Sequence, residues 1–415
     1  MSLLKTSVWS ALIVIVGSAV GFISQKLYAI HTGASGLLAI GNFNNFAAIV
    51  YIAGSGGIYA GIVKTIASVN ERDEQQRMLK SIFGLLACFS LVSAAILLLT
   101  DRFIYPFLYN DLPVSRMVNM VFYLTLPFII FSNGILYVMN GRNLIRKYAV
   151  ISIAIHIINL VLTWFFVKHF QINGALFSLF LPSVAGFLLM LIIARENFAM
   201  PSFSLNDILN KGLFRTLLGF SAVAILSILL LSASQLIVRD FILSEYSIPE
   251  AGNWQALSNI SKIWMAVITG ILSIYFFPKV VSLQLRHELS TEIRKLLTSG
   301  IPILILLFLV IFIFSGDLLQ LVYSAAFEGG AAYMAYQLVG DLLKSIGMVF
   351  GYVFLAKGQL RPYAFTEIAF TAIYIALSFG FGKLYGMQGV FMAYAVSYLL
   401  YTIMQIWIYN IIKTN

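Results

Sequence analysis

The chain has 415 residues, of which 60% are hydrophobic and only 10% are charged, and its mean hydropathy is +0.94. These values lie far outside the usage of soluble globular proteins and indicate an integral membrane protein. The net charge of +10 could suggest a nucleic-acid partner, but its distribution along the chain follows membrane topology, so we expect no nucleic acid.

Apolar windows of roughly 20 residues, long enough to cross a hydrocarbon core about 30 Å thick, recur along the whole chain. We predict an all-α fold with about 12 transmembrane helices, at 8–30, 36–63, 81–99, 118–139, 148–167, 174–194, 214–238, 254–278, 296–315, 331–355, 362–382 and 388–410. The longest outer loops fall near 100–117 and 316–330. No folded domain outside the membrane is expected.

The positive charges are divided unequally between the loops. With an even number of spans and both termini in the cytoplasm, the inner segments carry about 18 Lys and Arg and the outer segments about 5. Cytoplasmic loops of membrane proteins carry such an excess, so both termini are predicted to be cytoplasmic. The first apolar run has full span length and no clear cleavage site follows it, so we expect no cleavable signal peptide.

The sequence repeats weakly after about 215 residues. The best match is KHFQINGAL (168–176) against KLYGMQGVF (383–391). Six spans per repeat is an even number, so both halves would enter the membrane in the same orientation. They would be related by a pseudo-twofold axis along the membrane normal. We predict two six-helix lobes, 1–205 and 206–415, joined by the polar inner segment around 195–213.

Motifs for enzyme chemistry are absent from the sequence. There is no GxxxxGK[ST] phosphate loop, no HExxH and no cluster of His or Cys with metal-ligand spacing. The single Cys88 excludes a disulfide framework. We therefore expect no ATP hydrolysis by this chain, no catalytic residue, no cofactor and no metal.

Three lysines, Lys26, Lys262 and Lys344, lie inside predicted spans, where an ammonium costs about 2.5–3.5 kcal/mol on insertion scales. Lys26 is near the outer end of its span, where its stem could reach water, and the repeat aligns it with Arg239. Lys262 lies deeper and has no acidic residue within one helical turn. It is predicted to face an aqueous cavity.

Carboxylates accompany only some of these cations. Asp341 and Lys344 are neighbours at i, i+3, which fits an internal ion pair. The alternative is that Asp341 is a proton or cation site that is released when Lys344 moves. Glu367, about five residues into its predicted span, is a second candidate for ion coupling, although its position also fits the membrane interface.

Uncharged polar side chains form stripes at helical spacing. In lipid such groups need partners, so the stripes should face the bundle interior or a water-filled cavity. The predicted cavity-lining polar residues are Gln25, Asn42, Asn45, Gln255 and Asn259. For the two asparagines, interhelical packing through amide hydrogen bonds is the alternative interpretation.

Three cations, Lys26, Arg239 and Lys262, could converge near the pseudo-axis. A pyrophosphate head group would suit them, because each phosphate oxygen accepts charge-assisted hydrogen bonds. Such a cationic cleft would let a polar, anionic head pass while an attached lipid tail stays in the bilayer.

The two six-span lobes, the scarcity of loops and four segments resemble a known family. The segments are GNFNNF (41–46), NWQALSNISK (253–262), YQLVGDLLK (336–344) and LAKGQLRPY (355–363). The chain resembles lipid-linked oligosaccharide flippases, the polysaccharide-translocase branch of the multidrug/oligosaccharidyl-lipid/polysaccharide exporter superfamily. It is most similar to the O-antigen and enterobacterial-common-antigen flippases, and the resemblance covers essentially the whole chain.

This resemblance implies that undecaprenyl-pyrophosphate-linked repeat units move from the cytoplasmic to the periplasmic leaflet of a bacterial inner membrane. Movement would occur by alternating access, coupled to an ion gradient. The cation-lined central cavity of the family maps onto Lys26, Arg239, Lys262 and Lys344. The implied partners are the lipid-linked oligosaccharide and membrane lipid, with polysaccharide polymerase and chain-length regulator proteins as further partners.

Other functions fit the sequence less well. A multidrug or cation antiporter of the same superfamily would need an acidic cavity, whereas no carboxylate lies near Lys262. A membrane polysaccharide polymerase or ligase would need a sizeable outer loop with Arg, His or carboxylate residues. A flippase of lipid-linked peptidoglycan precursor usually has two more spans. We therefore predict a transporter and not an enzyme.

Overall fold

A computed structural model describes residues 3–59, 62, 66, 72–109, 112–142, 144–194, 211–283 and 285–414. Every regular element within these ranges is helical, which confirms the predicted all-α fold. Contacts divide the chain into two compact units, 1–229 and 230–415. Each unit is described by itself below.

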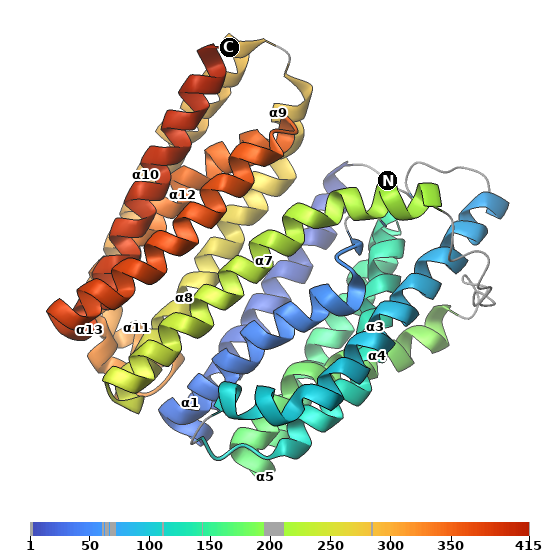
Figure 1. The fold of residues 1–415 in the computed structure, drawn as a ribbon, viewed down its shortest axis with the longest axis horizontal. Coiled ribbons are helices and arrows are strands. Elements are labelled where there is room, and N and C mark those ends of the chain that lie inside the picture. The colour runs from blue at the N-terminus through green and yellow to red at the C-terminus, as the bar shows by residue number, and fades with distance from the viewer. Residues whose placement is uncertain are drawn as a thin grey trace. The chain divides into compact units, whose positions relative to one another are not determined.

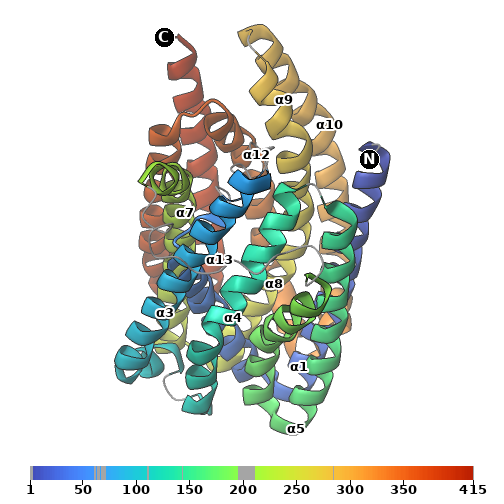
Figure 2. The ribbon, with the colours of Figure 1, turned by 90° about the vertical axis from the view of Figure 1, so that its right-hand side faces the viewer.

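The N-terminal unit contains α1 (Leu3–Ser55), α3 (Arg72–Tyr109), α4 (Arg116–Gly141), α5 (Ile145–Ala194) and the first part of α7 (Lys211–Glu245). Within it α3 packs on α1 and α4, and α5 packs on the same two helices, so the four close a ring (Figures 1 and 2). The centre is aromatic. The ring of Phe43 lies 4.9 Å from that of Phe122 and 5.8 Å from that of Phe180, between centroids.

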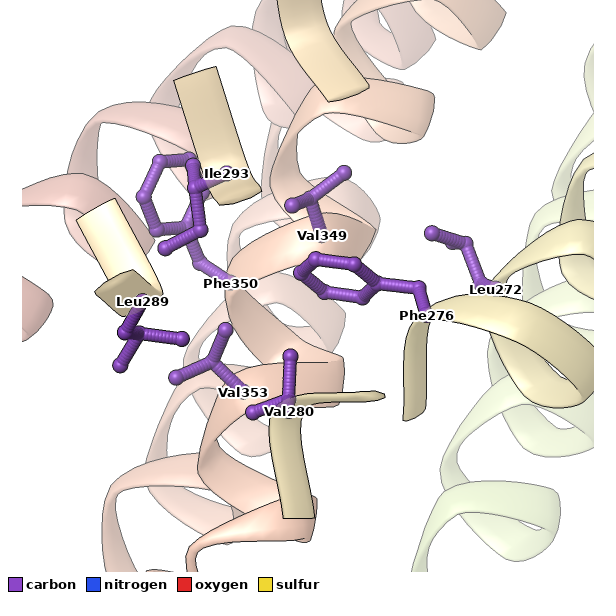
Figure 3. Close-up of a cluster of buried hydrophobic side chains, with 8 residues drawn as sticks. All are labelled: Leu272, Phe276, Val280, Leu289, Ile293, Val349, Phe350 and Val353. Carbon is purple, nitrogen blue, oxygen red and sulfur yellow. The ribbon is translucent and has the colours of Figure 1, made fainter. Parts of the chain in front are cut away.

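The C-terminal unit continues from α7 into a longer series of elements. They are α8 (Ile248–Ile271), the π-helical turn η1 (Leu272–Phe276), α9 (Phe277–Ser282), α10 (Arg286–Ile313), α11 (Ser315–Val322), the 3-10 helix η2 (Ala325–Tyr333), α12 (Met334–Ala356) and α13 (Leu360–Thr414). Its hydrophobic cluster joins η1, α9, α10 and α12, with Phe276, Ile293 and Phe350 among its members (Figure 3). α12 also packs on α13 and α8.

Three of the labelled helices are in fact pairs of helices. The backbone leaves helical geometry at Gly33 in α1 (φ 61°, ψ −158°), at Gln171 in α5 (φ 48°, ψ −122°) and at Gly386 in α13 (φ 66°, ψ −156°). Each break falls between two predicted spans. The two predicted spans on either side of each break therefore correspond to separate helical segments.

Two of these breaks show the repeat directly, because Gln171 and Gly386 occupy equivalent positions in the best sequence match. Three residues later, at Gly174 and at Gly389, an added Cβ would lie 1.9 Å from the carbonyl oxygen of the residue eight positions earlier. The two turns have the same close backbone approach. Only glycine fits there without a shift of the main chain.

Gln171 has a positive φ at a position where the second repeat has glycine, so exchanging the two residue types should have opposite effects. Gln171→Gly is expected to raise the free energy of unfolding by about 1 kcal/mol, because a side chain in this region is strained. Gly386→Gln should lower it by about 1–3 kcal/mol. Thermal unfolding of the purified variants in detergent measures both changes. Shifts of the same sign would contradict the assignment.

The predicted outer loop at 100–117 is wrong over its first part, since α3 continues to Tyr109. The extension is held by Asp101, which is 3% exposed and accepts hydrogen bonds of 3.0 Å from the Asn119 amide and the Tyr123 hydroxyl of α4. Hydropathy does not show how far a helix continues beyond the membrane when tertiary contacts stabilise it.

The second predicted outer loop, 316–330, likewise contains most of α11 and the start of η2. The predicted span 36–63 is too long, because α1 ends at Ser55. Gly56 and Gly57 follow with φ of 60° and 65°, values that terminate a helix.

Among the described residues, eight helices are long and apolar enough to cross a membrane, and the chain is a multi-pass membrane protein. α8 is not one of the eight, although the predicted span 254–278 begins in it and continues through η1. The total number of crossings and the cytoplasmic termini stay predictions. The lobe boundary at 205/206 also stays a prediction. It falls outside the described residues, as does most of the joining segment around 195–213.

Candidate functional site

The C-terminal unit contains a cluster of polar side chains between its helices. They come from α7, α8, α12 and α13. Six of the predicted site residues belong to it: Arg239, Gln255, Asn259, Lys262, Asp341 and Lys344. The cluster has two parts, one cationic and the other centred on a carboxylate.

The cationic part is a chain of side-chain hydrogen bonds. The guanidinium of Arg239 on α7 donates to Oε1 of Gln255 on α8. The Gln255 amide donates to Oδ1 of Asn259 at 2.8 Å, and the Lys262 ammonium donates to the same oxygen at 3.1 Å. Residues 255, 259 and 262 follow at i+4 and i+3, the spacing that places side chains on one helix face.

Solvent exposure rises along this series of hydrogen bonds, from Arg239 to Lys262. Arg239 is 1% exposed, with its guanidinium carbon 5.3 Å from the ring centroid of Trp254, whereas the side chain of Lys262 is exposed. Gln255 is fully buried. Because Lys262 bonds to a neutral amide oxygen, this bond leaves its positive charge uncompensated and available to an anion.

The second part surrounds Asp341, which is fully buried on α12. Its Oδ2 accepts hydrogen bonds from the Ser261 hydroxyl at 2.6 Å and from the Trp264 indole N–H at 2.9 Å, both on α8. Its Oδ1 accepts from the Tyr394 hydroxyl of α13 at 2.6 Å and, more weakly, from Gln337 at 3.5 Å. One carboxylate therefore ties three helices together.

Among the described residues, Lys344 does not form the ion pair with Asp341 that their i, i+3 spacing allows. Its ammonium lies 5.3 Å from the ring centroid of Tyr398, a cation–π contact. Glu367 on α13 is half-buried, and its Oε1 accepts a hydrogen bond of 3.0 Å from the Tyr401 hydroxyl.

The partners of Asp341 were not predicted as site residues. Ser261 and Trp264 flank Lys262 at i−1 and i+2, so the α8 stripe could have indicated them. Tyr394, with Tyr398 and Tyr401, repeats at i+4 and i+3 on the second helix of α13. That spacing marks a face, but it does not show which helix the face contacts.

The other predicted residues belong to the N-terminal unit. Lys26, Gln25 and Asn45 are half-buried there. Asn42 is 7% exposed, and its amide donates to the carbonyl oxygen of Leu108 at 2.5 Å. Since the last carbonyls of a helix lack intrahelical partners, this bond satisfies one near the end of α3. This favours the packing interpretation for Asn42.

Removing this amide should reduce stability. Asn42→Ala leaves a buried carbonyl without this donor and is expected to lower the free energy of unfolding by about 1–3 kcal/mol. Asn44→Ala is the matched control, since Asn44 is exposed on the same helix, and it should change stability little. Thermal unfolding of both variants in detergent measures the difference. Equal melting temperatures would show that the bond to Leu108 contributes nothing.

No group of three or more His, Cys, Asp or Glu that could hold a metal ion is found in the described ranges.

Comparison with solved structures defines the class of fold. An inward-facing multidrug resistance MATE family transporter of the MOP superfamily matches with a TM-score of 0.72 and 16% identity, over 95% of this chain and 97% of that chain. The lipid II flippase MurJ in an inward closed conformation also matches with a TM-score of 0.72, at 12% identity, over 98% of this chain and 87% of that chain. The chain therefore has the same fold as these two solved structures.

Sequence comparison narrows the relationship. The chain is 25% identical over 402 residues to the lipid III flippase of Escherichia coli (strain K12), which covers 97% of this chain and 96% of that protein. The lipid III flippase of Shigella flexneri matches to the same extent. No family model matches the chain. The predicted resemblance is confirmed as a whole-length similarity to proteins named lipid III flippases, and the relatives named here are transporters.

Proposed function

We propose that this chain is a flippase that moves a polyprenyl-pyrophosphate-linked oligosaccharide from the cytoplasmic to the periplasmic leaflet of a bacterial inner membrane by alternating access. The observation that carries this proposal is the uncompensated cation at the end of the α8 stripe. Arg239 and Lys262 are joined through two neutral amides within the helices of one unit. Whole-length similarity to lipid III flippases supports the same class of substrate.

The chemistry of the cluster fits a diphosphate. Lys262 is an exposed residue whose ammonium is a point charge, and a phosphate oxygen can replace the Asn259 oxygen as its acceptor. Arg239 is buried and held by Gln255, so its role is to keep the amides oriented while it adds positive potential. Lys344 adds a third cation, and Lys26 of the N-terminal unit, which the repeat aligns with Arg239, stays part of this proposal.

A multidrug antiporter is the alternative within the same fold. It would bind cations, which requires an accessible carboxylate. Asp341 is fully buried, and three close donors from α8 and α13 surround it. The exposed charge of the cluster is Lys262, which lies on α8 between Ser261 and Trp264. The MATE matches share the fold at 14–17% identity, whereas the similarity found by sequence comparison over almost the whole chain is to flippases.

Ion coupling is proposed to act through Asp341. A change in the charge of Asp341 alters the hydrogen bonds that it accepts from Ser261 and Trp264. These residues precede Lys262 by one position and follow it by two. Binding or loss of a cation at Asp341 would thereby shift α8 and the head-group contact that it carries. Glu367 is a second candidate, since it lies near the same tyrosine face through Tyr401.

We propose further protein partners that would act on the translocated oligosaccharide on the periplasmic side. A translocated repeat unit must be polymerised to a controlled length, so a polysaccharide polymerase and a chain-length regulator are the expected neighbours. The similarity to lipid III flippases supports this proposal only through the class of substrate.

Reconstitution tests the function. Proteoliposomes containing the chain and a polyprenyl-pyrophosphate oligosaccharide in both leaflets are treated with a membrane-impermeant glycosidase. The cleavable fraction should rise from the fraction facing outward at the start towards completeness, while protein-free vesicles stay constant. A fraction that does not rise, with correctly folded protein and an imposed ion gradient, would contradict the proposal.

A further inference from the structure

A groove on the C-terminal unit lies apart from the polar cluster, where α10 and α13 meet over α12. Its volume is about 370 Å³. The floor is apolar: Ile293 and Phe350 belong to the hydrophobic cluster of Figure 3, and Leu297 and Ile406 are half-buried beside them. The rim is polar, with Arg294 and Asn410 exposed.

The charge at this rim is not neutralised. The guanidinium of Arg294 makes no hydrogen bond or ion pair with any described residue, and the Thr298 hydroxyl bonds to the backbone carbonyl of Arg294, not to its side chain. Glu292 lies on the opposite face of α10, where it accepts a hydrogen bond of 2.7 Å from Tyr275. Glu288 also lies off the groove face by helical spacing. The groove therefore pairs an apolar floor with an available cation.

The helix that forms one wall faces the lipid. Only 6% of the most apolar window of α10 is buried, and Ile303, Leu306 and Ile313 are each at least 65% exposed. Arg294 comes just before the predicted span 296–315, in a segment that the charge distribution places in the cytoplasm. Basic pockets between transmembrane helices on this side bind anionic lipid head groups.

We propose that this groove binds an anionic phospholipid of the cytoplasmic leaflet. The lipid phosphate accepts charge-assisted hydrogen bonds from Arg294 and a further bond from the Asn410 amide. One acyl chain lies over Leu297 and Ile406. The site is separate from the substrate cations and holds whether or not the chain transports an oligosaccharide.

Native mass spectrometry of the delipidated, purified chain tests this site. Phosphatidylglycerol should bind at least tenfold more tightly than phosphatidylcholine. Arg294→Ala should reduce this preference to threefold or less, and Arg294→Lys should retain part of it. Lys295→Ala is the matched control, because Lys295 is an adjacent exposed cation that does not line the groove, and it should leave the preference unchanged.

Three results would overturn the proposal. The first is equal binding of the two lipids by the unaltered chain. The second is an Arg294→Ala variant with an unchanged preference. The third is displacement of bound phosphatidylglycerol by a polyprenyl pyrophosphate at equal concentration, because the groove would then hold the substrate tail. None of these measurements depends on transport, so failure here leaves the proposed flippase function standing.

Discussion

Lys262→Ala is expected to lower the rate of oligosaccharide translocation by about ten- to a hundredfold, while the protein still inserts in the membrane. The physical reason is the loss of a charge-assisted hydrogen bond to the head group, worth about 1.5–3 kcal/mol. Lys262 is exposed and bonds only to a neutral amide oxygen, so its removal leaves no buried carboxylate without a partner. Cells carrying this variant should retain lipid-linked repeat units on the inner leaflet.

Two further variants make this result specific. Lys262→Arg keeps the charge and should retain part of the activity. Lys383→Ala removes an exposed lysine from a predicted outer segment and should transport normally. Translocation is measured in proteoliposomes at equal protein content. Undiminished surface polysaccharide and an unchanged rate in Lys262→Ala would show that this ammonium does not contact the head group.

Asp341→Asn is expected to reduce transport at least tenfold and to abolish the response of the remaining activity to a collapsed ion gradient. The substitution keeps the shape of the side chain but removes its charge. An asparagine oxygen can still accept from Ser261 and Trp264, while the Tyr394 hydroxyl can turn to accept from the new amide. The fold should therefore survive, and the loss should be one of coupling.

Ser261→Ala is the matched control for Asp341→Asn. It removes one donor to Asp341 but keeps the carboxylate, so it should cost about 1 kcal/mol of stability and retain the gradient response. Transport rates with and without an ionophore measure the response. An Asp341→Asn variant that responds to the gradient like the unaltered chain would leave Asp341 as a packing residue.

Much of the fold could be predicted from hydrophobic patterning. The predicted spans correspond to helical segments, and the non-helical residues Gly33, Gln171 and Gly386 fall between them. Helix ends were less predictable. α3 continues to Tyr109 because Asp101 finds partners on α4, a contact that depends on two helices and not on local composition.

The candidate site was predicted along single helices but not between them. The stripe of Gln255, Asn259 and Lys262 forms the hydrogen-bond chain that its spacing suggests. Asp341, by contrast, has its nearest helical neighbour Lys344 as the obvious partner, yet its close donors include Tyr394, 53 residues away. One sequence does not indicate which distant helix supplies a partner.

The most direct test of the account is the chemistry of the membrane when this chain is deleted from its host. Lipid extracts should contain an accumulated polyprenyl-pyrophosphate-linked oligosaccharide, inaccessible to a glycosidase added outside spheroplasts, and surface polysaccharide should fall in parallel. Re-expression of the unaltered chain should reverse both changes, and Lys262→Ala should reverse neither. A deletion strain with no accumulated lipid-linked glycan and normal surface polysaccharide would contradict the proposed flippase function.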